Sequence, residues 1–565
     1  NLNDYCLGKE DTSCTDNLTN VIIKSGEYYI LMASGDSNLS NNTYHHLDFK
    51  IGDNDTLYLF KNKTIIDTLF IPNLDTGYSY GKSLEYGEYY YSSPTPDYSN
   101  GSGIIAISTP PTFNQVGGIY NNIENLTIKL SGEGDIYYTT NGADPTTSSF
   151  KYTEPLVLDK TTVIKAITVV KDKRNSSVST ESYIINENHT VPVVSIVVDP
   201  GKLSYLNKNA WITGITIPVY TEYFGEDGTF AISSGLKLFG GTTRGDSKKS
   251  YALKFSKEYG VGTLNYQVFA NRDYATYEDL VLRTASQDEN RAIIRDILGT
   301  SLVDGVTNAY VQAYKTVILY INGEYWGIYF LREKTDENYV SNNFNVPVDG
   351  TDLLRVDGEV KSGTTTAYNK LVSYINTHNL SNNEYYEYVS SLIDIDSFID
   401  FWVAETYVTN NDIVNYRYFR NPNLDDGKWK FIFYDLDWAF YNYDKDYYSF
   451  ATSLEGMTVN SYSTVLLRNL MKNADFKKRF VERVSYQLKN VWNEERINTK
   501  MAEILAELEP ELERNFERWN LSEDDFEYQL GRLKTYIAKR EAYMISQTKS
   551  FFNLTDEEVE YYFGE

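Results

Sequence analysis

The segment 407–443 carries two clusters of polar side chains on either side of a strand-like apolar run. They are Asn410, Asn411, Asp412 and Asn415 before the run, and Asp435 and Asp437 after it. Carboxylates this close to large aromatic residues are costly to bury without a partner, and a cation is the obvious partner. Oxygen ligands of this kind suit magnesium, manganese or calcium rather than zinc. The alternative is a strand that ends in a turn, with Asp435 bonded to the backbone.

A second stretch that could do chemistry is the loop 240–250, which is rich in glycine, hydroxyl groups and cations. Backbone N–H groups and cationic side chains in such a loop suit phosphate recognition. The loop is not a Walker sequence, and it lacks the Gly-x-Gly-x-x-Gly pattern of ordinary kinases. Its residues alone are therefore a weak signal for a phosphate site.

The bulk composition narrows the classes of function. The formal net charge of −26 argues against nucleic-acid binding, because that requires a basic face that releases counterions. The same charge disfavours an anionic membrane surface, and no apolar run approaches the ~18 residues of a membrane span. Histidine chemistry is not expected either, because the four histidines lie outside every motif: His45, His46, His189 and His378.

The two cysteines, Cys6 and Cys14, both lie near the start of the sequence. A short disulfide formed in an oxidising compartment and a pair of free thiols are both open readings. Cysteine-based metal sites and thiol catalysis are excluded from the rest of the chain. The sequence begins at Asn1 rather than methionine, so we expect that an upstream segment, such as a secretory signal, has been removed.

The elements that must position these residues fall into several domains, because 565 residues are too many for one core. Residues 17–107 alternate β-branched or aromatic runs with Gly, Asn and Asp, as sandwich strands do. The Ser-Thr-Pro-Pro run at 108–111 marks a stiff boundary. Beyond it, a strand that enters Asn141-Gly142 predicts a hairpin.

The remaining residues change from strand to helix patterns. A buried strand is predicted at 191–198, and a hairpin is predicted around Asn322-Gly323. Helical periodicity first occurs over 289–302, and from about 366 the pattern is largely helical. The charged, amphipathic tail 494–552 is predicted to be a helical cover on the domain.

The first two segments resemble known accessory modules. Leu-Tyr-Leu-Phe-Lys-Asn-Lys-Thr-Ile-Ile-Asp, Gly-Tyr-Ser-Tyr-Gly-Lys and Ser-Pro-Thr-Pro-Asp-Tyr-Ser-Asn resemble the lamin-tail domain. The succession from 136 to 167 is similar to the chitobiase/β-hexosaminidase C-terminal-type domain. These resemblances imply two all-β, Ig-like sandwiches, at 1–107 and 108–187. Their expected role is to position or tether the protein, and they could contact carbohydrate or cell wall.

The rest of the chain resembles the spore coat protein H (CotH) family of atypical, kinase-like proteins. The motifs are Gly-Gly-Thr-Thr-Arg-Gly-Asp-Ser-Lys-Lys-Ser-Tyr at 240–251, Leu-Arg-Thr-Ala-Ser-Gln-Asp at 282–288 with Arg-Asp at 295–296, Tyr-Ile-Asn-Gly-Glu-Tyr-Trp-Gly-Ile-Tyr at 320–329, Asn-Asn-Asp at 410–412 and Tyr-Asp-Leu-Asp at 434–437. The resemblance implies an α+β kinase-like domain over 188–565 with a helical C-terminal part. It also implies phosphorylation of protein side chains that depends on ATP and on Mg or Mn.

Phosphoryl transfer needs a positioned nucleophile, cations and fixed donors around the γ-phosphate. Asp412 is our candidate for orienting the acceptor hydroxyl or accepting its proton, and Asn415 could help to hold a metal. Asp435 follows the strand 428–433, where a metal-binding acid would replace the Asp-Phe-Gly element of ordinary kinases. Asp437 points the same way along an extended chain and is a second candidate ligand, or else a structural acid bonded to the backbone.

The candidates for nucleotide contacts are less sharply defined. Lys249 aligns with the Lys-Lys-Ser element of the family and is the first choice for the phosphate-contacting lysine. Lys254, on the following strand, is the second choice, and either could be a surface lysine. Glu333 ends a strand roughly where the adenine-facing hinge of a kinase would lie, although an ion pair with a lysine is equally open.

Two arginines, Arg244 and Arg283, could contact phosphate. They could instead only pair with acids, such as Asp288 and Asp296. The sequence does not choose between these two roles.

The favoured reading is a secreted or cell-surface kinase that transfers a phosphoryl group from ATP to Ser or Thr of an extracellular or spore-surface protein. The competing reading is a non-catalytic adhesion or binding protein on a pseudokinase scaffold, which the acidic surface and the accessory modules fit equally well. A glycan hydrolase would need paired carboxylates across a cleft. Retention of Asp412, Asn415 and Asp435 together favours chemistry, because a scaffold has no need for that set.

Overall fold

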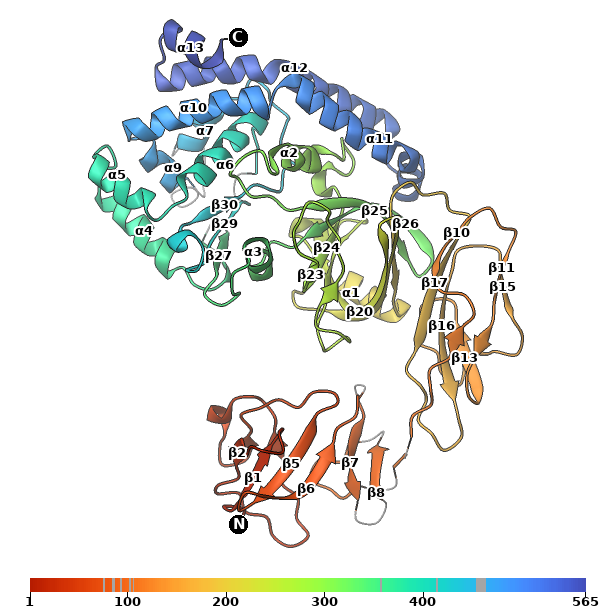
Figure 1. Cartoon of the computed structure of the whole chain (residues 1–565). Coiled ribbons are helices and arrows are strands. Elements are labelled where there is room, and N and C mark those ends of the chain that lie inside the picture. The colour runs from red at the N-terminus through yellow and green to blue at the C-terminus, as the bar shows by residue number, and fades with distance from the viewer. Residues whose placement is uncertain are drawn as a thin grey trace.

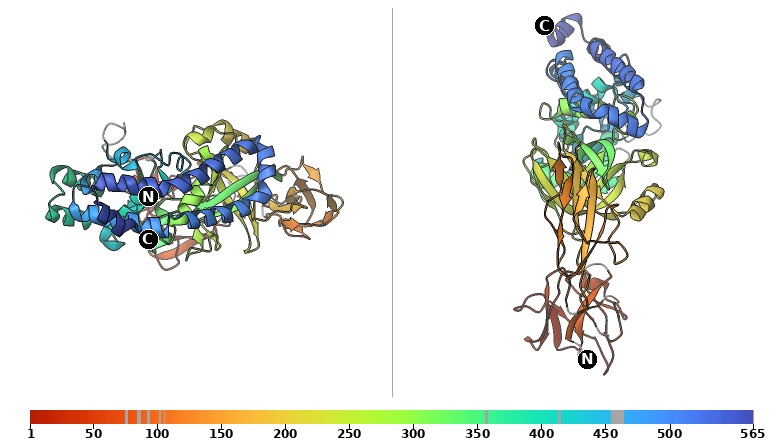
Figure 2. Two further views of the ribbon diagram at one scale, coloured as in Figure 1. Left: turned by 90° about the horizontal axis from the view of Figure 1, so that it is seen from above. Right: turned by 90° about the vertical axis from the view of Figure 1, so that its right-hand side faces the viewer.

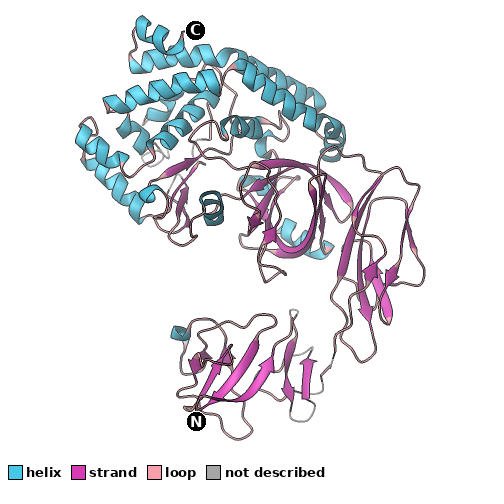
Figure 3. Ribbon diagram, in the orientation of Figure 1, coloured by secondary structure: helices cyan, strands magenta, loops and turns pink. Residues whose placement is uncertain are grey.

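The computed structural model describes residues 1–74, 77–83, 87–91, 94–100, 103–104, 106–355, 358–412, 415–453 and 464–564. Figure 1 shows two β-rich parts followed by a larger part, in which a β-barrel adjoins a group of helices. In the side view of Figure 2, the N-terminal part lies at the opposite end of the molecule from the C-terminal helices. Strands therefore dominate the first parts and helices the last, as the sequence predicts (Figure 3).

The N-terminal part is built on a four-stranded sheet with the order β2-β1-β5-β6. Its elements are β1 (Tyr5–Gly8), β2 (Asp16–Asn17), β3 (Leu31–Met32), η1 (Ser37–Leu39), β4 (His45–His46), β5 (Thr56–Lys61), β6 (Thr64–Phe70), β7 (Ser79–Ser83) and β8 (Gly87–Tyr91). Strands β5 and β6 are joined through Asn62 and Lys63, both at positive φ, as a type I′ hairpin turn requires. The Ig-like arrangement of this part stays a prediction.

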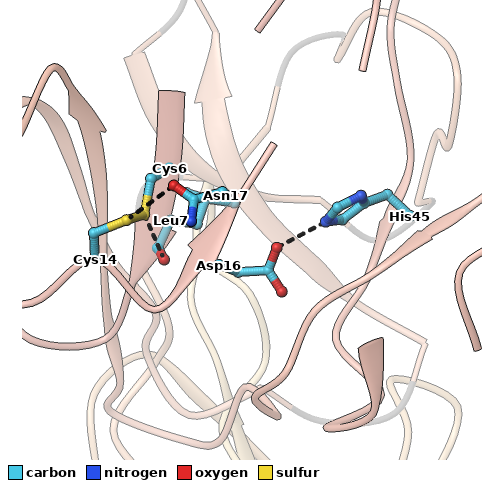
Figure 4. Close-up of a disulfide and its surroundings, with 6 residues drawn as sticks. All are labelled: Cys6, Leu7, Cys14, Asp16, Asn17 and His45. Carbon is cyan, nitrogen blue, oxygen red and sulfur yellow. Dashed lines mark hydrogen bonds and ion pairs between the residues drawn. A yellow bond between two sulfur atoms is a disulfide. The ribbon is translucent and has the colours of Figure 1, made fainter. Parts of the chain in front are cut away.

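Cys6 and Cys14 form a disulfide, so the free-thiol alternative is wrong (Figure 4). Beside it, His45 Nε2 and Asp16 Oδ1 lie 2.7 Å apart. The Cys6–Cys14 disulfide ties β1 to the segment that leads into β2. It closes a short loop in the N-terminal part, whose apolar core is small, so covalent support compensates for a small buried area.

The second part has a five-stranded sheet with the order β10-β17-β16-β13-β14 and two smaller strand pairs, β11-β15 and β12-β9. Its strands are β9 (Thr112–Phe113), β10 (Gly118–Tyr120), β11 (Leu126–Ile128), β12 (Leu130–Ser131), β13 (Asp135–Thr139), β14 (Phe150–Lys151), β15 (Leu156–Leu158), β16 (Thr162–Val169) and β17 (Ser179–Ile185). Alternate residues of β13, β16 and β17 face one apolar core.

The hairpin predicted around Asn141-Gly142 forms between β13 and β14, but its loop is long and spans 140–149. Gly142 has a φ of +83°, and a Cβ at this position would overlap the side-chain oxygen of Asn322 in the barrel. The loop is therefore shaped by its contact with the next part of the chain rather than by the shortest turn between two strands.

The third part begins with a closed barrel of seven strands in the order β18-β19-β20-β21-β24-β26-β25. These strands are β18 (Val193–Val197), β19 (Ile217–Gly225), β20 (Gly228–Phe239), β21 (Ser250–Lys254), β24 (Asp279–Arg283), β25 (Tyr314–Ile321) and β26 (Glu324–Glu333). The hairpin predicted at Asn322-Gly323 is confirmed between β25 and β26. Helix α1 (Pro200–Lys208), the turns η2 (Thr242–Gly245) and η3 (Ser286–Asp288) and the pair β22 (Leu264–Asn265) and β23 (Thr276–Tyr277) complete this region.

Helices and a small sheet, β28-β27-β29-β30, follow the barrel. The elements are α2 (Arg295–Val303), α3 (Glu337–Phe344), β27 (Asp352–Arg355), β28 (Val360–Ser362), α4 (Thr366–Thr377), α5 (Asn383–Ser390), α6 (Ile395–Val408), β29 (Arg417–Arg420), η4 (Asp425–Gly427), β30 (Lys430–Ile432), α7 (Tyr447–Thr452), α9 (Val465–Leu470), α10 (Ala474–Asn490), α11 (Glu494–Trp519), α12 (Glu523–Phe552) and α13 (Asp556–Phe563). Every residue of helix α6 except Asp396 is buried, and the helix lies at the centre of this region. Among the described helices, none is long and apolar enough to cross a membrane.

The helix predicted over 289–302 begins later than expected, at Arg295. Ile293 has a φ of +66°, which interrupts a helix, and Asp288 instead accepts hydrogen bonds from the backbone of Ala292 and Arg295. The residues before Arg295 thus form a compact turn that connects β24 to α2. This turn also supplies part of the candidate site.

Candidate active site

The acids that follow β30 are set by a sharp turn of the backbone. Asp435 has a φ of +67°, in the left-handed region that a non-glycine residue adopts only at a cost. The side chain of Leu436 is fully buried, and its backbone N–H donates to Asp296 Oδ1 at 2.9 Å. The extended chain that we assumed between Asp435 and Asp437 is therefore wrong, and the two acids are held on either side of an anchored leucine.

Arg283, at the end of β24, is the immediate partner of Asp435. Its Nη2 lies 2.5 Å from Asp435 Oδ1, and its side chain is 8% exposed. Burial lowers the pKa of Arg283, but Asp435, Asp296 and Asp437 outweigh burial and leave that pKa above its ordinary value. The arginine therefore lies among three carboxyl groups that come from two separate segments of the chain.

The two acids that the sequence offered as partners for the arginines have other arginines as their direct ion-pair partners. Asp288 pairs with Arg295 inside the turn before α2, where burial raises the pKa of Asp288 to about 6. Asp296 pairs with Arg332 of β26. Burial alone would raise the pKa of Asp296, but Arg332 and then Arg283 lower it to about 2.

Asp437 is the most unusual acid of the group. Burial and then the neighbouring Asp435 raise the pKa of Asp437 to about 8. Its Oδ2 accepts a hydrogen bond of 3.2 Å from the backbone N–H of Gln287. The Gln287 side chain in turn donates to Thr242 Oγ1 at 3.4 Å, so Asp437 is linked to the glycine-rich loop through one residue.

Asp412 follows helix α6 and is half-buried. Its Oδ2 accepts a hydrogen bond from Asn415 Nδ2 at 2.5 Å, and Asn415 Oδ1 accepts one from Arg355 at 2.7 Å. Burial and then the charge of Asp435 raise the pKa of Asp412. Asp412 and Asp435 are thus close enough for their charges to interact, while Asn415 connects Asp412 to an arginine.

Glu405 lies behind this acid and was missed in the sequence. It is 1% exposed, and burial raises its pKa to about 8, with Asn410 as a hydrogen-bond partner and Asp412 as a neighbouring charge. Asn410 also accepts a hydrogen bond of 3.0 Å from the backbone N–H of Asp412. No local motif marks Glu405, because it occurs within an apolar helix whose buried face only the structure defines.

A buried lysine and glutamate form an ion pair next to the acids. Lys248 Nζ lies 2.5 Å from Glu289 Oε1, and the lysine side chain is 4% exposed. Burial lowers the pKa of Lys248, against the opposing charge of Glu289. Glu289 also accepts a hydrogen bond of 2.9 Å from the backbone N–H of Ala285, which anchors the pair to the turn that holds Asp437.

The sequence singled out two other lysines, and neither is in this pair. Lys249 Nζ donates to the carbonyl oxygens of Arg244 and Asp246 at 2.7 and 2.8 Å, and so closes its own loop. Lys254 is the last residue of β21, about 17 Å along the chain from Lys249 at ~3.3 Å per residue. Residue types could not separate Lys248 from Lys249, because Tyr251 and Ala252 are both buried and the strand shows no alternation.

The remaining predicted contacts lie at the edge of the site or away from it. Arg244 donates to the carbonyl oxygen of Leu238 at 3.0 Å, and its buried Nε has no hydrogen-bond partner within the described residues. Glu333 does not pair with a lysine, because it is held by Arg272 at 3.0 Å and by the backbone N–H of Ala313 at 2.6 Å. These bonds leave Glu333 buried in a structural network rather than facing the acids.

The acids and Asn415 bear on the metal ion that the sequence predicts. Asp435, Asp437 and Asn415 offer oxygen atoms, which suit magnesium or manganese. Burial and then the charge of Asp435 raise the pKa of Asp437, and a cation bound beside it would favour its charged form. Against this, no three His, Cys, Asp or Glu side chains in the described ranges converge as a preformed cage. The residues thus fit a cation that keeps ligands from water or substrate, as magnesium commonly does.

Two protein families match segments of this chain. The CotH kinase protein family matches residues 236–544, which include the glycine-rich loop, Arg283 and the acids. The Fn3 associated family matches residues 126–183, within the second β-rich part. No curated protein matches the chain. Because the first match spans more than half of the sequence, this chain belongs to the CotH kinase protein family.

Proposed function

We propose that this chain is a kinase that transfers a phosphoryl group from ATP, with Mg²⁺ or Mn²⁺, to Ser or Thr of an extracellular or spore-surface protein. The observation that carries the proposal is the grouping of Asp435 and Asp437 around Arg283, with Asp412 close enough to Asp435 for their charges to interact. The buried Lys248–Glu289 pair adjoins the same turn, as the lysine–glutamate pair of protein kinases adjoins their phosphate site.

Each residue has a distinct task in the proposed reaction. The acceptor hydroxyl oxygen attacks the γ-phosphorus, the bond to the bridging oxygen of the leaving ADP breaks, and the hydroxyl proton passes to Asp412. The raised pKa of Asp412 makes it a better proton acceptor than an exposed aspartate. Asp435, Asp437 and Asn415 would hold the metal ion. A bound metal would supply positive charge to the phosphate oxygens.

A second candidate function is a non-catalytic binding or adhesion protein on a pseudokinase scaffold. One observation favours it: Arg283 occupies Asp435, so the acid proposed to bind metal already has a cationic partner. In an active enzyme this ion pair must open or be shared with the metal. In a scaffold it would remain closed.

The proposed place of action is outside the cell or on its surface. The Cys6–Cys14 disulfide supports an oxidising compartment, where such bonds persist. The two N-terminal β-rich parts would position or tether the kinase and could contact carbohydrate or cell wall. The large negative charge supports neither nucleic acid nor an anionic membrane as the partner.

Radiolabelled ATP tests the proposal directly. The wild type, incubated with Mg²⁺ or Mn²⁺, is expected to label itself or a generic acidic or basic protein acceptor, whereas Asp435→Ala is expected to lose the signal. Asp444→Ala is the matched control, because it removes an exposed acid from the same segment and should keep the signal. If the wild type shows no labelling and no nucleotide-induced thermal shift, the scaffold is the correct function.

A further inference from the structure

We infer that Asn515 of helix α11 is a positioning residue for Lys248, and that the linker 186–190 after the Fn3-associated part holds α11 in place for this task. The inference rests on the proposed function, since it assigns Lys248 to the phosphate site. It also gives the second β-rich part a role inside the catalytic unit, beyond that of a spacer.

The contact between Asn515 and Lys248 is direct and fully buried. Lys248 Nζ donates to Asn515 Oδ1 at 2.9 Å, and the backbone N–H of Ile328 donates to the same oxygen at 3.1 Å. Two donors meet this oxygen, so the amide cannot be turned over without placing N–H groups against them. Asn515 Nδ2 is left without a hydrogen-bond partner among the described residues, which shows that acceptance by the oxygen sets the orientation.

The backbone of β26 is shaped for this approach. Gly327 has a φ of +102°, and a Cβ there would lie 2.5 Å from Asn515 Oδ1. Trp519, one turn further along α11, donates from Nε1 to the carbonyl oxygen of Trp326 at 2.8 Å. Helix α11 is thus fixed to the β25–β26 hairpin, and glycine at 327 is required for Asn515 to reach Lys248.

Towards its N-terminus, helix α11 contacts the linker 186–190 that follows the Fn3-associated part. His189 Nδ1 lies 3.0 Å from Glu511 Oε1, and Glu187 pairs with Arg514. The His189 ring also lies 2.8 Å from the hydroxyl of Tyr320 through Nε2. Positions 511, 514 and 515 lie on one face of a helix, because residues three and four apart are neighbours.

The Fn3-associated part is also docked to the barrel away from α11. Ser182 of β17 donates its backbone N–H to Glu222 of β19 at 3.1 Å, and its hydroxyl lies 2.8 Å from that of Ser195. Lys202 of α1 lies 3.6 Å from Asp144. With these contacts at several points, the linker is anchored at both ends, so it can restrain α11 and through it Lys248.

Chemical labelling of amines tests the inference without relying on enzyme activity. We compare the rate at which acetic anhydride modifies Lys248, measured by peptide mass spectrometry on the full chain. Asn515→Leu is expected to raise this rate about tenfold, which corresponds to about 1.4 kcal/mol of lost local restraint. Trp519→Phe is the matched control, because it removes another bond between α11 and β26 and leaves Lys248 untouched.

Two further variants decide between positioning and a merely structural role. Asn515→Asp keeps the acceptor oxygens and is expected to restore slow labelling, also where Asn515→Leu does not fold. His189→Phe keeps a ring against Tyr325 and removes the bond to Glu511, and it is expected to raise labelling of Lys248 by a smaller factor. Equal labelling in Asn515→Leu and Trp519→Phe, or no rescue by Asn515→Asp, overturns the inference. An absence of kinase activity in every variant, including the wild type, counts only against the proposed function.

Discussion

Replacing Arg283 by glutamine separates the two proposed functions, because Arg283 and a metal ion compete for Asp435. The glutamine side chain has a stem similar to that of arginine but carries no charge. In the wild type, the Arg283 guanidinium contacts Asp435 at 2.5 Å and is close to Asp296 and Asp437. The substitution removes the cation and leaves these carboxyl groups to repel one another.

The size of the effect follows from the charges. Two unit charges about 4 Å apart attract by about 4 kcal/mol at an effective dielectric constant of about 20. A metal ion that replaces the arginine at Asp435 must overcome this attraction. Removal of the Arg283 charge is therefore expected to tighten Mn²⁺ binding by about ten- to a hundredfold, or about 1.4 to 2.8 kcal/mol. The same change lowers the free energy of unfolding in the absence of metal by about 3 to 5 kcal/mol, as for a broken buried ion pair.

Electron paramagnetic resonance of free Mn²⁺ measures the binding, and urea unfolding with and without Mn²⁺ measures the stability. The variant is expected to regain stability when Mn²⁺ is added, while the wild type changes less. Arg420→Gln, which removes an arginine from Asp352 in the neighbouring sheet, is the control and should leave Mn²⁺ binding unchanged. Mn²⁺ affinity that is equal or weaker in Arg283→Gln would refute the competition between Arg283 and metal.

Three other predictions concern separate parts of the molecule. Asp412→Asn is expected to lower the rate of phosphoryl transfer by about a hundredfold or more, since general-base catalysis contributes a factor of about 10²–10⁴ to a rate. ATP binding, measured by calorimetry, should persist in this variant. Loss of ATP binding would reassign Asp412 to the metal. Burial raises the pKa of Glu222 to about 8 from 4.5, so the folded chain holds more protons than the unfolded chain between these values. The free energy of unfolding therefore falls by up to about 5 kcal/mol as the pH rises from about 4.5 to about 8. Urea unfolding measures this dependence on pH. An equal dependence in the Glu222→Gln variant and the wild type would contradict the prediction. The double substitution Cys6→Ser and Cys14→Ser is expected to destabilise the N-terminal part by about 2 to 3 kcal/mol. This effect would be measured as a lower midpoint of the thermal transition of that part. ATP binding should not change.

The sequence predicts the order of strands and helices well because local patterns dominate them. The Asn322-Gly323 hairpin, the buried strand at 193–197 and the C-terminal helices each follow from turn residues and periodicity. The helix start at Arg295 could not be predicted in the same way. It depends on the positive φ of Ile293 and on the carboxylate of Asp288, which are features of tertiary packing rather than of propensity.

The motifs of the sequence contain Asp412, Asp435 and Arg283, but not all of the groups around them. Arg355 comes from a remote segment and Glu405 from the helix before Asp412, and no motif marks either of them. The lysine is the clearest example. Lys248 and Lys249 have the same type and adjacent positions, and only the approach of Asn515 from α11, more than 250 residues later, buries the first one.

The burial of Asp437 bears on the proposed cation site. Its raised pKa of about 8 means that the carboxylate is disfavoured at neutral pH in the absence of added positive charge. A scaffold would gain stability from an asparagine or an apolar residue at this position, because either fills the space without the cost of a buried charge. A metal ion reverses that preference, since it stabilises the carboxylate and is stabilised by it. A cation bound at Asp437 would therefore favour the charged form that the proposed kinase needs, whereas a closed ion pair between Arg283 and Asp435 is what the alternative scaffold needs.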